Sequence, residues 1–142
     1  MLRELSTGEC EALLSRARVG RIAVRDAEGA YIVPMSFVYD GGVIHAHTSP
    51  GHKRQLLRRW PHVAFQADEV EEVDHWRSVL VRGRFRELSD PDEQAHTRLL
   101  LVRAFAGNPA AVTAPHGHRT TLADAVTFRI EPESLTGRAE GL

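Results

Sequence analysis

Apolar residues recur along much of this chain with the two-residue period of β-strands. The clearest case is Trp76–Leu88, where Val79, Val81 and Phe85 face one way and the intervening arginines face the other. Arg21–Arg25 alternates in the same manner. The predicted strands are Arg21–Arg25, Tyr31–Tyr39, Val43–Thr48, His62–Glu72, Trp76–Leu88, Ala125–Ile130 and, as one further candidate, Ser134–Ala139.

Three segments have the signals of helices rather than strands. Ser6 and Glu9 form a capping-box pattern before apolar residues at helical spacing, and Gly20 is expected to end that first helix. Asp90 and Pro91 are typical of a helix start, with proline at the first helical position. The predicted helices cover residues 6–17, 51–60 and 90 to about 105.

The connections between these elements favour a mostly antiparallel sheet. Asp40-Gly41-Gly42 is a strong tight-turn signal between two strands. The stretch Tyr31–Tyr39 is almost continuously apolar, so both of its faces are expected to be covered. Residues 107–121 have no periodicity and are expected to form a long loop. Hairpin-linked strands with short helices between them indicate a β-barrel flanked by helices, although alternation alone does not distinguish a barrel from a sandwich.

Length and composition limit the classes of protein that fit. At 142 residues, 42% hydrophobic and 26% charged, the chain is expected to form a single domain over residues 1–142. A net charge of −1 argues against nucleic-acid binding, which needs a clustered positive surplus. No apolar run is long enough to cross a membrane, and the N-terminus lacks the apolar core of a signal peptide. With Cys10 as the only cysteine, we expect a cytoplasmic protein.

Lys53 is the one lysine among 18 basic residues. Chance explains this as readily as function. The functional interpretation is that the position needs a compact ammonium donor, which the planar fork of arginine does not imitate.

The segment around this lysine has the order of a phosphate site. His47-Thr48-Ser49-Pro50-Gly51-His52-Lys53 ends a strand in two hydroxyls, turns, and opens a helix. The N-terminus of a helix has free N–H groups and a partial positive charge, which suit an anion. The alternative is a surface turn whose lysine lies along apolar neighbours and reaches solvent with its ammonium group.

Four segments in order resemble the flavin-binding split-barrel superfamily that includes pyridoxamine 5'-phosphate oxidase. Arg16–Asp26 resembles the opening helix and strand, and Val33–Lys53 resembles the central hairpin and phosphate loop. Trp76–Leu88 is similar to the strand with the W-x-S-V-x-V-x-G pattern, and Leu135–Arg138 is similar to the closing motif. The Gly51-His52-Lys53 sequence resembles the nitroimidazole-resistance-type branch, where the oxidases proper have Arg-Lys.

The resemblance implies a six-stranded antiparallel split barrel that works as a homodimer and binds flavin mononucleotide (FMN) at the dimer interface. It implies an oxidoreductase that reduces small electron-poor substrates such as nitro-aromatics or quinones, with His52 as catalytic proton donor. The alternatives are a haem-binding or haem-degrading protein, a deazaflavin-dependent reductase, and a flavin-binding module without turnover. The residues expected to contact the cofactor are Val33, Pro34, Met35, Ser36, His47, Thr48, Ser49, His52, Lys53, Trp76 and Ser78.

Eight histidines also raise the question of a metal or haem. No spacing of a structural zinc site is present, so no metal site is predicted. Haem needs an axial ligand, which the loop residues His116 or His118 could supply.

Overall fold

The structure is a computed structural model that describes residues 1–105 and 125–141. Within those residues the chain forms three helices, α1 (Thr7–Arg16), α2 (His52–Arg59) and α3 (Pro91–Ala104). None of these helices is long and apolar enough to span a membrane. The strands are β1 (Leu2–Glu4), β2 (Val19–Asp26), β3 (Gly29–Ser36), β4 (Val38–Asp40), β5 (Val43–Thr48), β6 (His62–Glu72), β7 (His75–Glu87) and β8 (Val126–Glu140).

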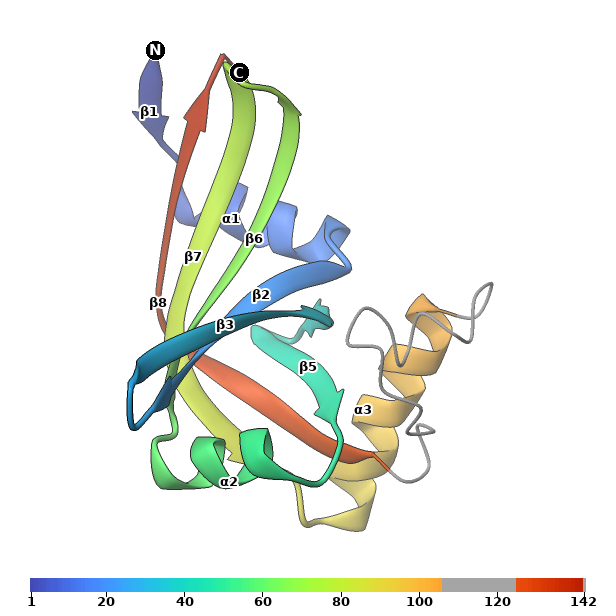
Figure 1. Cartoon of the computed structure of the whole chain (residues 1–142). Helices are drawn as coiled ribbons and strands as arrows, with labels where there is room; N and C mark the ends of the chain where they lie inside the picture. The colour runs from blue at the N-terminus through green and yellow to red at the C-terminus, as the bar shows by residue number, and fades with distance from the viewer. Residues whose placement is uncertain (106–124, 142) are drawn as a thin grey trace.

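The strands form one antiparallel sheet in the order β3-β2-β6-β7-β8-β5-β4, with β1 added on β8. Six of them are six residues or longer, while β1 and β4 have three residues each. No pairing joins β3 to β4 among the described strands, so the sheet curls round the core without closing. Figure 1 shows α2 at the end of β7 opposite the β6–β7 turn, and α3 beside β5. This architecture confirms the predicted split barrel of six main strands with flanking helices.

The alternation seen in the sequence decides which side chains fill the barrel. Val79, Val81 and Phe85 of β7 are buried, whereas Arg82 and Arg84 between them are exposed. The inward side chains of the other strands join them in one cluster, in which the rings of Phe37 and Phe65 pack edge to face at 4.8 Å. The outward side chains of β7 are therefore available for contacts outside the barrel.

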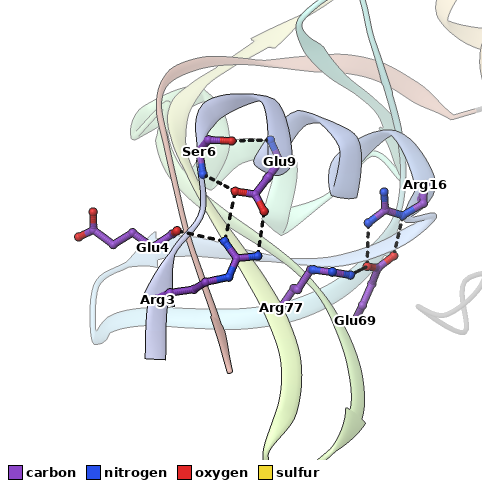
Figure 2. Close-up of polar contacts among 7 residues, drawn as sticks. All are labelled: Arg3, Glu4, Ser6, Glu9, Arg16, Glu69 and Arg77. Atoms are coloured by element: carbon purple, nitrogen blue, oxygen red, sulfur yellow. Dashed lines mark hydrogen bonds and ion pairs between the residues drawn. The ribbon is translucent and has the colours of Figure 1, made fainter. Parts of the chain in front are cut away.

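Helix α1 begins at the capping box that the sequence predicts (Figure 2). The Glu9 amide donates to Ser6 Oγ at 3.2 Å, and the Glu9 carboxylate accepts from the Ser6 amide at 3.0 Å. The same carboxylate pairs with Arg3 on β1 at 2.9 Å. Strand β1, which the sequence analysis missed, is thereby tied to the start of the helix.

A second carboxylate holds the other end of α1 against the sheet (Figure 2). Glu69 on β6 accepts two hydrogen bonds from Arg16, at 2.9 and 3.0 Å, and lies 3.8 Å from Arg77 on β7. The side-chain bond to Arg16 lowers the pKa of Glu69. Both ends of α1 are thus fixed by ion pairs to strands, while Cys10, Leu13 and Leu14 are buried beneath it.

Two sequence predictions differ from the structure in detail. Gly20 does not end α1, which stops at Arg16; it lies inside β2, where a Cβ would collide with the ring of Phe65 and approach the carbonyl oxygen of Gln66 to 2.8 Å. The two segments predicted near the C-terminus are one strand, β8, which passes a register shift opposite Arg82 and Gly83. The predicted loop 107–121 lies outside the described residues.

The stretch Tyr31–Tyr39 is split between β3 and β4, and one of its faces is open in the single chain. Ile32 is 69% exposed and Pro34 is also exposed, whereas Met35 and Phe37 are buried. The expectation that both faces are covered therefore does not hold within one chain. The predicted turn at Gly41 and Gly42 is confirmed, because both residues have positive φ, 62° and 78°.

Candidate functional site

The N-terminus of α2 is open to an anion. Its N-cap residue is Gly51, at φ 152°, which has no side chain of its own to cap the first N–H groups. The first turn contains no acidic residue. Within the described part of the chain, a Cβ placed on Gly51 would meet no heavy atom within 4 Å, so a ligand can approach the backbone closely. The positive end of this helix therefore lacks any acidic or capping side chain of its own.

Lys53 lies half-buried in that first turn. Among the described residues it has no hydrogen bond or ion pair, and burial lowers the pKa of its ammonium group. An ammonium group that is partly desolvated and has no counterion is costly for the protein. A bound anion would supply the missing charge.

The two arginines near Lys53 are already neutralised. Glu87 at the end of β7 accepts paired hydrogen bonds from Arg54, at 2.8 and 3.0 Å, and from Arg58, at 3.0 and 2.7 Å. These bonds hold the pKa of Glu87 at about 2. These ion pairs fix α2 against the sheet, whereas Lys53 has no carboxylate partner among the described residues.

The end of β5 brings further polar groups to the same place. His47 is buried, and its pKa falls to about 4 because of desolvation and, second, the nearby charge of Lys53. Thr48 is buried, and its hydroxyl donates to the Ser49 carbonyl at 3.4 Å. Thr127 on β8 is directly opposite His47, and its buried hydroxyl has no hydrogen-bond partner in the described structure. The predicted groups from β5 and α2 thus gather at one end of the barrel.

His45 has a structural role that separates it from this group. Its Nδ1 lies 2.9 Å from Thr97 Oγ1 on α3, and its Nε2 lies 3.2 Å from the Asp40 carbonyl oxygen. Burial lowers the pKa of His45. Both ring nitrogens are engaged, so this histidine links β5 to α3.

The predicted segment from Val33 to Ser36 forms the last part of β3. This strand pairs with β2 alone, so its second edge is unpaired among the described strands. Val33 is half-buried, Pro34 is exposed, and Met35 and Ser36 are buried. A free backbone edge is suited to hydrogen bonding with a planar ring that carries donors and acceptors.

Trp76 and Ser78 lie on the outer face of β7 and line a cavity of about 620 Å³. Ser78 Oγ accepts a hydrogen bond from the Gln66 side chain at 2.9 Å. Ser78 lies nine positions before Glu87, the residue that anchors α2, which corresponds to roughly 30 Å along the strand. One copy of the chain therefore does not bring these two residues together with Lys53.

The only cluster of possible metal ligands among residues 1–105 and 125–141 is Glu72, Asp74 and His75. It lies at the exposed β6–β7 turn, where His75 Nδ1 is 3.2 Å from the Asp74 carboxylate. Glu72 and Asp74 are exposed and His75 is half-buried, and three groups are fewer than a tetrahedral zinc site with four protein ligands requires. The haem candidates His116 and His118 lie outside the described residues.

Known proteins resemble this chain over nearly its whole length. The family model for pyridoxamine 5'-phosphate oxidase matches residues 6–139. The chain belongs to this family. A crystal structure of an FAD-binding protein from Mesorhizobium loti is 32% identical, covers 97% of each chain, and superposes with a TM-score of 0.82.

Two other structures extend the comparison. The FAD-binding protein from Mycobacterium smegmatis is 25% identical, with 96% of this chain and 97% of that one covered, at a TM-score of 0.68. A Bacteroides thetaiotaomicron protein assigned to 5-nitroimidazole antibiotic resistance has a TM-score of 0.72 over 97% of this chain and 88% of its own. At 19% identity, that likeness concerns the fold alone.

Sequence reasoning missed three residues at these places: Glu87, Thr127 and Gln66. Glu87 ends an alternating strand and has no motif of its own. Thr127 and Gln66 are recognisable only after strand pairing is known, because their partners come from β5 and β7. Strand alternation does indicate that Gln66 faces outward, away from Phe65.

Proposed function

We propose that this protein binds a flavin coenzyme, with its phosphate at the N-terminus of α2. The observation that carries the proposal is the half-buried, unpaired Lys53 in the first turn of a helix without a side-chain cap. Lys53, His52 and the backbone N–H groups would hold the phosphate, and Thr48 and Ser49 would border it. FMN is the smallest flavin coenzyme that carries a phosphate, so it is the form we propose. The FAD-binding proteins of M. loti and M. smegmatis support a flavin in general.

The site is completed by a second copy of the chain. Trp76 and Ser78 lie roughly 30 Å along β7 from the α2 anchor, too far to reach the same flavin from one chain. The exposed Ile32 and Pro34 give the outer face of the sheet an apolar surface that a partner could cover. We therefore propose a homodimer in which one copy supplies α2 and β3 and the other supplies β7.

The reaction that fits the site is two-electron reduction of a small electron-poor substrate, such as a quinone or a nitro-aromatic compound. The flavin, when bound, would supply the electron transfer. The free edge of β3 would orient its ring, and Lys53 would neutralise its phosphate. His52 is exposed at the first position of α2, where it can exchange protons with solvent and deliver one to the reduced substrate. A His52→Ala variant is expected to keep its flavin, because Lys53 and the backbone N–H groups of α2 still hold the phosphate, and to lose turnover.

The first experiment is an absorption spectrum of the purified protein, before and after addition of equimolar FMN or haemin. After unbound cofactor is removed by gel filtration, we expect the wild type to retain a flavin band that the Lys53→Met variant does not retain at the same concentration. A Soret band without flavin uptake would replace the proposal with haem binding. Uptake of a deazaflavin but not FMN would keep the site and change its cofactor. Flavin binding with no turnover of any quinone or nitro-aromatic compound would indicate a binding module.

A further inference from the structure

A second cavity lies beside the proposed phosphate site. It has a volume of about 450 Å³ and lies between α2 and the β2–β3 turn. His52, Gln55 and Arg59 line it from one face of the helix, because residues three and four apart lie on the same side. His52 therefore lines this cavity and also occupies the first position of α2, beside the proposed phosphate site.

The far end of this cavity has a platform for a planar ring. Trp60 lines the cavity, and the guanidinium groups of Arg59 and Arg25 lie 4.6 and 5.3 Å from the centre of its ring. Nucleobases stack both on aromatic rings and on guanidinium planes. A nucleobase could therefore stack on the indole ring of Trp60 or on one of the two guanidinium groups.

The remaining lining groups match the polar edges of a nucleoside. Gln55 is exposed and offers an amide, which forms paired hydrogen bonds with adenine. Asp26 and Glu28 offer carboxylates from the β2–β3 turn, and carboxylates commonly accept hydrogen bonds from ribose hydroxyls. Asp26 also accepts the Glu28 amide at 2.9 Å, which fixes the turn.

We propose that this cavity is a subsite for an adenylate group, next to the flavin phosphate. The position of this subsite beside a flavin phosphate rests on the proposed function, but the residues that line the cavity define the adenylate as its ligand. From His52 to Arg59 the helix rises by roughly 10 Å, which separates a phosphate at the N-terminus from a base at Trp60. The volume lies within the range of about 300–1,000 Å³ that small-molecule sites occupy. The adenylate would be either the second half of FAD or part of a nicotinamide dinucleotide that donates electrons.

The test begins with AMP, which contains the proposed group without any flavin. Calorimetric titration of the full chain is expected to show binding that Trp60→Ala and Gln55→Ala each weaken roughly tenfold or more. Gln55 is exposed, so its substitution leaves the fold intact even if Trp60→Ala does not. Arg58→Ala is the matched control, because Arg58 is on the same helix but engages Glu87. No AMP binding, or binding that neither variant weakens, would overturn the inference.

Two further arms identify the source of the adenylate. If it belongs to FAD, the wild-type protein binds FAD at least tenfold more tightly than FMN, and Trp60→Ala removes that difference without affecting FMN. If it belongs to the electron donor, FAD and FMN bind equally, and Trp60→Ala raises the KM for NADH or NADPH in the FMN-loaded protein. AMP binding without any flavin binding would refute the proposed function and leave this subsite standing.

Discussion

Replacing Lys53 with methionine separates ligand binding from folding. The substitution keeps an unbranched side chain of similar length and removes the ammonium group. A charge-assisted hydrogen bond contributes about 1.5–3 kcal/mol. Since Lys53 is half-buried and lacks a competing carboxylate among the described residues, that full range applies to a bound phosphate. The dissociation constant for FMN is therefore expected to rise by roughly tenfold to 150-fold.

The unliganded protein is expected to behave differently. Burial lowers the pKa of Lys53, which means that its charged form is less favourable in the folded protein than in the unfolded chain. Lys53→Met should then leave the free energy of unfolding unchanged or raise it. Fluorescence titration with FMN and urea denaturation of the same preparations measure the two effects.

Arg58→Ala provides the control for charge alone. It also removes one cation from α2, but Arg58 is exposed and Glu87 retains Arg54 as its partner. Exposed ion pairs contribute at most about 1 kcal/mol, so little change in FMN affinity is expected. Equal weakening of FMN binding by Lys53→Met and Arg58→Ala would refute the phosphate contact. In that case the loss of one positive charge from α2, wherever it lies, would account for the weaker binding of both variants.

Three further predictions concern the scaffold and the assembly. The folded-state pKa of His47, about 4, lies below its ordinary value, so the stability linked to neutral His47 is present above about pH 6.5 and lost as the pH falls to 4. The unfolding free energy of the wild type minus that of His47→Gln should therefore fall by roughly 3 kcal/mol over that interval. A constant difference in urea denaturation would contradict this prediction. Gly20→Ala should lower the unfolding free energy by about 1–3 kcal/mol or prevent folding. Gly8→Ala should leave the unfolding free energy unchanged, because the atom nearest to its added Cβ is 4.0 Å away. Equal thermal stability of the two variants would contradict the prediction. Light scattering should find a dimer for the wild type and a monomer for Ile32→Glu; a monomeric wild type would remove the shared site.

The alternation of apolar residues predicted the strands and their buried faces well because it reflects burial directly, whereas the choice of a barrel came from the family resemblance. Inward residues of β7 such as Val79 and Val81 are buried, and the capping box at Ser6 starts α1 where expected. Gly20 was misjudged for a physical reason. A glycine after a helix usually indicates the end of that helix, but here the requirement comes from Phe65, which is 45 positions later in the chain.

The candidate site was only partly predictable for a related reason. His47, Thr48 and Lys53 are close in sequence, so the local strand–turn–helix pattern placed them together. Glu87 and Thr127 reach the same end of the barrel through strand pairing, which a single sequence does not display. Ser78 was joined to Lys53 by the family resemblance alone, and their separation along β7 becomes visible only in the structure.

A crystal structure of the protein grown with FMN would locate the phosphate itself. We expect the flavin phosphate within hydrogen-bond distance of Lys53 Nζ and of the first N–H groups of α2, with Trp76 and Ser78 of a second copy beside the flavin. A phosphate bound elsewhere, with Lys53 still unpaired, would contradict it.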